Sequence, residues 1–122
     1  LVVHGADGFD EISISGPSTV AELTPDGVRT YSVTPEDAGL APHDVSALRG
    51  GTPQQNAAEM KLVLDGAPGA LRDFAVINAA AALVAWGSAP NLAEGVQLAA
   101  ESIDSGAAAE RLHAFVVATN KV

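Results

Sequence analysis

The feature that most constrains the fold is an almost unbroken apolar run, "FAVINAAAALVAW", at residues 74–86. Its length of about 13 residues is short of the roughly 20 that a helix needs to cross a bilayer. Pro68 lies shortly before this segment and Gly87 follows it directly, and these residue types commonly mark the start and the end of a helix. The pattern therefore predicts a helix buried in a protein core. Alanine is its commonest residue, so we expect other helices to approach it closely.

Cap signals predict further helices on both sides of this run. "TPED" at residues 34–37 predicts a short helical turn that ends by Gly39. "TPQQ" and "NLAE" have the spacing of a capping box, in which the first and fourth residues satisfy backbone groups at the helix start. The longer helices are therefore expected at about residues 52–65, 68–87, 91–106 and 107–119.

The first third of the chain is expected to form strands. Residues 1–4 are typical of the end of a buried strand, and residues 5–8 of a turn. Two segments rich in Val, Thr and Tyr flank the turn signal "TPDG", so we predict a hairpin over residues 18–33. A few strands including a hairpin, followed by four or five helices, place the chain in the α/β class.

The length of 122 residues allows one domain at most. The chain enters a strand-like segment without an initiator methionine, and three strands are few for an α/β core. We therefore expect residues 1–122 to be a portion of a larger domain whose other half lies upstream.

Charge and cysteine content disfavour several classes of function. Six Lys or Arg against fifteen Asp or Glu give a net charge of −9, and no basic cluster is present. Binding to nucleic acid or to an anionic membrane is therefore not expected, because both need positive charge. The chain has no cysteine, which excludes disulfides, zinc–thiolate sites and cysteine nucleophiles. This composition is compatible with a reducing cytoplasm, the expected location.

Three acidic residues crowd the loop after the first predicted strand, in "HGADGFDEIS". Asp10 and Glu11 could bind Mg²⁺, which prefers oxygen ligands and often takes one or two carboxylates plus water and phosphate. Adjacent side chains of an extended backbone point to opposite faces, so both reach one metal only where the chain turns. The alternative is a solvated acidic turn, because Asp and Gly favour turns for local reasons. The residues alone leave both interpretations open.

Several motifs in order resemble those of anthranilate phosphoribosyltransferases. "VVHGADGFDEIS" is similar to the family's HG-x-DG-(L/F)-DE segment, and "YSVTPEDAGL" to its PED-x-GL segment. "GGTPQQNAAEMKLVLDG", "RDFAVINAAAAL" and "EGVQLAAESIDSGAAAERL" are similar to the segments that follow in the family. The resemblance covers nearly the whole chain, and it is far more specific than the acidic pair alone.

The resemblance implies a glycosyltransferase of tryptophan biosynthesis with a phosphoribosyltransferase-type α/β catalytic domain. Such enzymes transfer a 5-phosphoribosyl group from phosphoribosyl pyrophosphate to anthranilate and release pyrophosphate. In that family the DE pair helps to bind Mg²⁺ that the pyrophosphate chelates, which assigns this role to Asp10 and Glu11. Family members are usually homodimers through N-terminal helices, so the intact protein is expected to be a homodimer.

The family's GTGGD pyrophosphate loop and KHGNR segment are absent from these 122 residues. The chain therefore resembles the C-terminal part of the catalytic domain, and we expect no catalysis from it alone. Two alternatives on the same fold are a pyrimidine nucleoside phosphorylase and a nucleic-acid-binding relative. The latter would need positive charge from the missing half.

The remaining polar and aromatic residues favour structural roles. Asn78 lies within the apolar run, where an amide usually hydrogen-bonds to a neighbour. Arg72 and Asp73 open the same segment and are expected to pair with other helices. Trp86 and Phe115 are expected to be core anchors.

Overall fold

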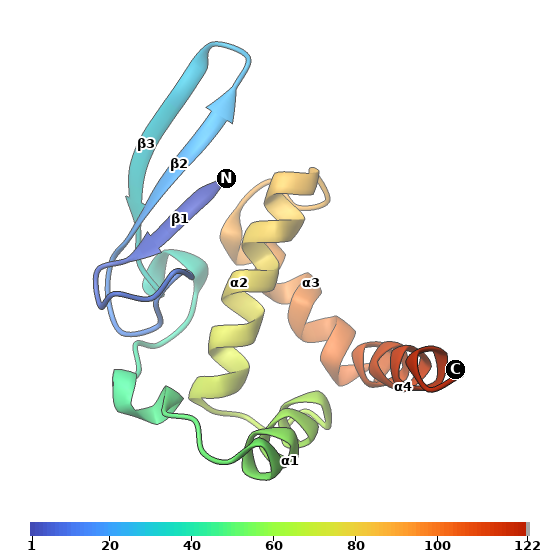
Figure 1. Cartoon of the computed structure of the whole chain (residues 1–122). Helices are drawn as coiled ribbons and strands as arrows, with labels where there is room; N and C mark the ends of the chain where they lie inside the picture. The colour runs from blue at the N-terminus through green and yellow to red at the C-terminus, as the bar shows by residue number, and fades with distance from the viewer. Residues whose placement is uncertain (122) are drawn as a thin grey trace.

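The computed structural model describes residues 1–121 as an α/β fold, with a small sheet on one side and helices on the other (Figure 1). The predicted fold class and the order of elements are confirmed. The strands are β1 (Val2–Gly5), β2 (Ser18–Thr24) and β3 (Gly27–Val33), the 3₁₀ turns are η1 (Glu36–Ala38) and η2 (Val45–Leu48), and the helices are α1 (Pro53–Leu64), α2 (Ala70–Trp86), α3 (Leu92–Asp104) and α4 (Ala107–Thr119).

The three strands form one antiparallel sheet in the order β1-β2-β3. The predicted hairpin is confirmed, with β2 and β3 paired from Ser18 opposite Val33 to Thr24 opposite Gly27. The prediction of a buried first strand is wrong for these residues, because β1 lies at the sheet edge and Val2 is 73% exposed. The free end of the hairpin projects away from the helices (Figure 1).

The core lies where the loop after β1, the sheet and the helices α2 and α3 meet. Ile12 and Ile14 of the loop are almost completely buried against this core. Helices α2 and α3 approach each other closely, because a Cβ on Gly95 would lie only 2.9 Å from the Cβ of Ala80. The expected close approach to the alanine-rich helix is therefore confirmed. The buried cluster consists of Ile12, Ile14, Val20, Val33, Ala38, Val76, Ile77, Ala80, Ala81, Val96, Ala99 and Ile103.

The cap signals give the observed helix starts. The Gln55 N–H donates to Thr52 Oγ1 at 3.3 Å, and the Thr52 N–H donates to Gln55 Oε1 at 2.8 Å, so the first capping box is confirmed. Asn91 accepts from the Glu94 N–H at 2.9 Å, but the Glu94 carboxylate bonds the Asn91 side-chain amide and not its backbone. The second box is therefore only half formed.

The apolar helix α2 is buried on one face only. Val76, Ile77, Ala80 and Ala81 face the core, whereas Ala75, Ala79 and Ala82 are exposed on the opposite side. In Figure 1 the sheet lies on one side of α2 and α3 on the other, and the three exposed alanines line a pocket together with residues of α1, α3 and α4. Within the described residues, no helix has both the length and the apolar character needed to span a bilayer.

The two predicted aromatic anchors are not in the core. Trp86 is 85% exposed at the end of α2, and Phe115 is 65% exposed on α4. Hydrophobicity alone indicates that a side chain favours burial, but it does not determine which elements are present to cover it.

Candidate metal-binding loop

The loop that follows β1 is a tight turn built on two glycines. The Gly5 N–H donates to the Phe9 carbonyl at 2.9 Å, and the Gly8 N–H donates to the Gly5 carbonyl at 3.0 Å. Gly8 has φ of 96°, which side chains rarely tolerate. A Cβ on Gly5 would lie 2.5 Å from the Asp7 carboxylate and 3.2 Å from the Ser13 Cβ. A side chain at residue 5 would therefore displace the Asp7 carboxylate.

Asp7 is held by its own loop. Its carboxylate accepts from the hydroxyls of Ser13 at 2.5 Å and Ser15 at 2.8 Å, and from the Phe9 N–H at 3.3 Å. Partial burial raises the pKa of Asp7, but these hydrogen bonds outweigh it and hold the pKa below the ordinary value of 3.8. One of the three acids in the loop is therefore a structural residue of the turn.

Removing these donors, as Ser13→Ala with Ser15→Ala, is expected to raise the pKa of Asp7. Because the folded-state pKa is depressed, the contribution of Asp7 to stability is present above about 3.8 and is lost as pH falls through the folded value. The double variant should therefore lose less stability between pH 5 and 2 than the wild type. NMR titration of the Asp7 carboxyl measures the shift, and the exposed Ser102→Ala serves as the control. An unchanged Asp7 pKa would contradict this account.

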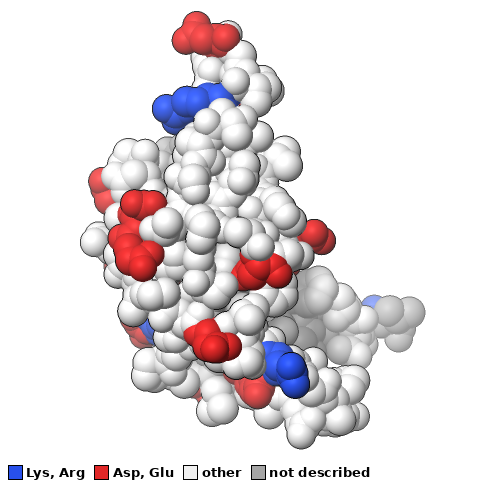
Figure 2. Space-filling view, turned by 90° about the vertical axis from the view of Figure 1, so that its left-hand side faces the viewer, with Lys and Arg blue, Asp and Glu red and all other residues white. Residues whose placement is uncertain are grey.

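Asp10 and Glu11 differ from Asp7 because their side chains are exposed and form no ion pair within residues 1–121. The chain bends at their positions. A bend is the kind of backbone at which adjacent side chains can turn toward one cation. On the face shown in Figure 2, acidic side chains are scattered and basic ones are few.

The two carboxylates fit Mg²⁺ better than a metal whose ligands must all come from protein side chains. Residues 1–121 contain no group of three or more His, Asp or Glu side chains that could hold a metal ion. Mg²⁺ usually takes one or two carboxylates and completes its shell with water and substrate phosphate. The two free carboxylates are consistent with that mode of binding.

Helix α2 contacts the loop on both sides of these two acids. The ring of Phe74 lies 5.7 Å from the ring of Phe9, centroid to centroid. The amide of Asn78 accepts from the Ile12 N–H at 2.8 Å and donates to the Ile12 carbonyl at 3.0 Å. The expectation that Asn78 is hydrogen-bonded is confirmed. Its partner lies 66 positions away, and the sequence contained no signal that identified it.

The start of α2 is held by two further pairs. Arg72 donates to both carboxylate oxygens of Asp104 at 2.7 and 3.0 Å and holds the pKa of that carboxyl down, which confirms a helix–helix pair. Asp73 bonds His43 at 2.7 Å, and His43 lies in a loop and not in a helix. The contact of His43 was missed because nothing in its local sequence indicates it.

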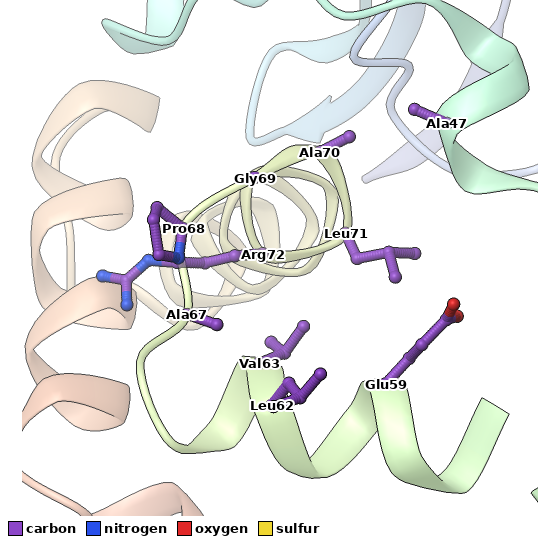
Figure 3. Close-up of a pocket in the computed structure, with 10 residues that line it drawn as sticks. All are labelled: Ala47, Glu59, Leu62, Val63, Ala67, Pro68, Gly69, Ala70, Leu71 and Arg72. Carbon is purple, nitrogen blue, oxygen red and sulfur yellow. The ribbon is translucent and has the colours of Figure 1, made fainter. Parts of the chain in front are cut away.

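A pocket between α1 and the start of α2 is a separate feature. Figure 3 shows Glu59 and Arg72 on opposite sides of it, with mainly apolar side chains between them. Neither Asp10 nor Glu11 lines this pocket. The acidic loop and the pocket are therefore different sites.

Comparison with known proteins gives consistent matches. A family model described as "Glycosyl transferase family, a/b domain" matches residues 1–109. Anthranilate phosphoribosyltransferase of Parvibaculum lavamentivorans is 53% identical over 119 residues, which cover 98% of this chain and 35% of that protein. The structure of the Saccharomyces cerevisiae anthranilate phosphoribosyltransferase with PRPP and Mg has a TM-score of 0.88 at 29% identity. The same yeast enzyme with 4-fluoroanthranilate has a TM-score of 0.88 at 30% identity.

Both structural matches cover 98% of this chain and 35% of the yeast chain. The chain thus spans about a third of the length of the curated relatives it matches. The resemblance first indicated by the motifs is confirmed by these matches.

Proposed function

Because the chain belongs to the glycosyl transferase family through its a/b domain, we propose that it is the C-terminal portion of an anthranilate phosphoribosyltransferase. In this proposal, residues 1–122 supply part of the catalytic domain, and the intact protein transfers a 5-phosphoribosyl group to the amine of anthranilate. Pyrophosphate is the leaving group. The likeness to the relatives over nearly the whole chain supports this assignment.

The observation that carries the proposal is the pair of free carboxylates, Asp10 and Glu11, at a bend that α2 contacts on both sides. A structural neighbour is described as binding PRPP and Mg. When bound, Mg²⁺ would neutralise negative charge on the pyrophosphate. Asp10 and Glu11 would hold the ion on its protein side, because carboxylates placed directly against pyrophosphate would repel it.

The exposed face of α2 supports the placement of this chain in a larger domain. A helix that is apolar all round is normally buried on every side. Trp86 and the alanines at residues 75, 79 and 82 leave such a face open in residues 1–121. The rest of the intact protein would cover it. We further propose that this intact protein is a cytoplasmic homodimer, on the strength of the family resemblance.

The test is an assay of 5-phosphoribosyl transfer from phosphoribosyl pyrophosphate to anthranilate. The intact protein is expected to release pyrophosphate in a reaction that requires Mg²⁺, and residues 1–122 alone are expected to show no turnover. Turnover by the 122 residues alone would contradict the role of this chain as a portion of the site.

Two other outcomes would replace the proposed activity. Phosphorolysis of pyrimidine nucleosides by the intact protein, without transfer to anthranilate, would assign it to the nucleoside phosphorylases. A strongly salt-dependent affinity for DNA, without transferase activity, would indicate a nucleic-acid-binding relative.

A further inference from the structure

We infer that Asn78 and Phe74 of α2 are positioning residues, which hold the Asp10–Glu11 pair in the arrangement that binds the cation. The inference rests on the proposed function of that pair. It concerns side chains that touch neither the substrate nor the cation and that act through the residues on either side of the pair.

The two contacts from α2 bracket the acidic pair. Phe9 directly precedes Asp10 and lies against the Phe74 ring, while Ile12 directly follows Glu11 and is bonded to Asn78. Residues four apart in a helix lie on the same face, so Phe74 and Asn78 present one continuous surface to the loop. The two acids therefore lie between two residues, Phe9 and Ile12, that each contact α2.

The Asn78 amide is itself locked in place. Besides its two bonds to the backbone of Ile12, its Nδ2 donates to the Phe74 carbonyl of its own helix at 3.0 Å. Ile12 is only 1% exposed, so water is poorly placed to replace these bonds. One acceptor and two donors in this geometry are what a side-chain amide provides. This accounts for the one polar residue in the apolar run.

The repulsion between Asp10 and Glu11 makes contacts that restrain their backbone more important here than in an ordinary loop. Asp10 and Glu11 are adjacent and of like charge, and no ion pair within residues 1–121 offsets their repulsion. If the backbone were not restrained, the two carboxylates would move apart because their like charges repel each other. Partners that orient metal ligands typically affect metal affinity or activity by about 10–100-fold.

The test uses the intact protein that carries this chain and two variants, Asn78→Leu and Phe74→Leu. Asn78→Leu removes the hydrogen bonds while keeping the number and branching of the side-chain heavy atoms, and Phe74→Leu keeps an apolar contact but removes the ring. Ile103→Ala is the control, because it opens the buried core from α3 and changes neither Phe74 nor Asn78. Hydrogen exchange of residues 9–12 measures the loop, and the Mg²⁺ concentration for half-maximal turnover measures the site.

We expect Asn78→Leu to speed exchange at residues 9–12 and to raise that Mg²⁺ concentration by about 10-fold or more, with little change in the KM for anthranilate. Phe74→Leu should act in the same direction and to a smaller extent. Ile103→Ala should lower stability but leave the Mg²⁺ requirement unchanged. If Asn78→Leu does not fold, Phe74→Leu decides the question by the same two measurements.

Unchanged exchange at residues 9–12 would overturn the inference directly. Faster exchange with an unchanged Mg²⁺ requirement would overturn it as well, provided that Asp10→Asn with Glu11→Gln does alter that requirement. If the acidic double variant has no effect on the Mg²⁺ requirement, the proposed role of the pair is wrong, and the inference that rests on it is wrong too.

Discussion

Replacement of both free acids, as Asp10→Asn with Glu11→Gln, is expected to lower the turnover of the intact protein by about 100-fold or more. A bound divalent cation contributes several kcal/mol to stabilising charge in a transition state, and each 1.36 kcal/mol corresponds to a factor of ten in rate. Both side chains are exposed and outside every ion pair of residues 1–121, so the substitutions should leave the fold intact.

The measurement combines steady-state kinetics with calorimetric titration of Mg²⁺ in the presence and absence of phosphoribosyl pyrophosphate. Donor-dependent binding of Mg²⁺ should be lost in the double variant. The matched control is Glu101→Gln with Glu110→Gln, which removes the same two charges from exposed positions on α3 and α4. If the acidic double variant behaves like this control, the loop is a solvated turn and the mechanistic assignment is wrong.

Gly95→Val is expected to destabilise the fold by about 3 kcal/mol, at the upper end of the usual cost of overpacking a core. A Cβ at this position would lie 2.9 Å from the Ala80 Cβ and 3.0 Å from both the Ala80 Cα and its carbonyl oxygen. Backbone atoms cannot rotate away as a side chain can, so α2 and α3 would have to separate. That separation would weaken the packing around Ile77 and Val96, on which the core depends.

Urea denaturation followed by circular dichroism measures this loss as a lower unfolding midpoint. Gln97→Val is the matched control, because it inserts the same side chain two residues further along α3 at an exposed position. That control should change stability by less than about 1 kcal/mol, since the helix propensities of ordinary residues differ by only a few tenths. Equal effects of the two substitutions would show that the α2–α3 contact tolerates added volume.

The contacts of individual residues show where prediction from sequence succeeded and failed. The Thr52 cap was predicted with its partner, because both bonding groups lie within three residues of each other. The Asn91 cap was predicted, but its Glu94 carboxylate bonds the side-chain amide and not the backbone, which is a rotamer difference that spacing does not contain. Trp86 was placed in the core on hydrophobicity, and in residues 1–121 it is exposed.

The acidic loop, too, was predicted in part from the sequence and explained in part only by the structure. Its three acids were recognised as a group, and the family resemblance singled out Asp10 and Glu11. The reason that Asp7 plays a different part lies in two serine hydroxyls that the turn brings beside it. The geometry of the turn therefore separates the structural acid from the two free ones.

By itself, the sequence determined where the hairpin turns, where the helices begin and end, and which family the chain resembles. The turn and helix-cap signals act between residues a few positions apart, so they are present before any packing occurs. Only the tertiary structure decided which face of α2 is buried, and that Asn78 meets Ile12 across 66 positions of chain. The physical reason is that such contacts depend on how the sheet, the loop and the helices pack against one another, which no local preference encodes.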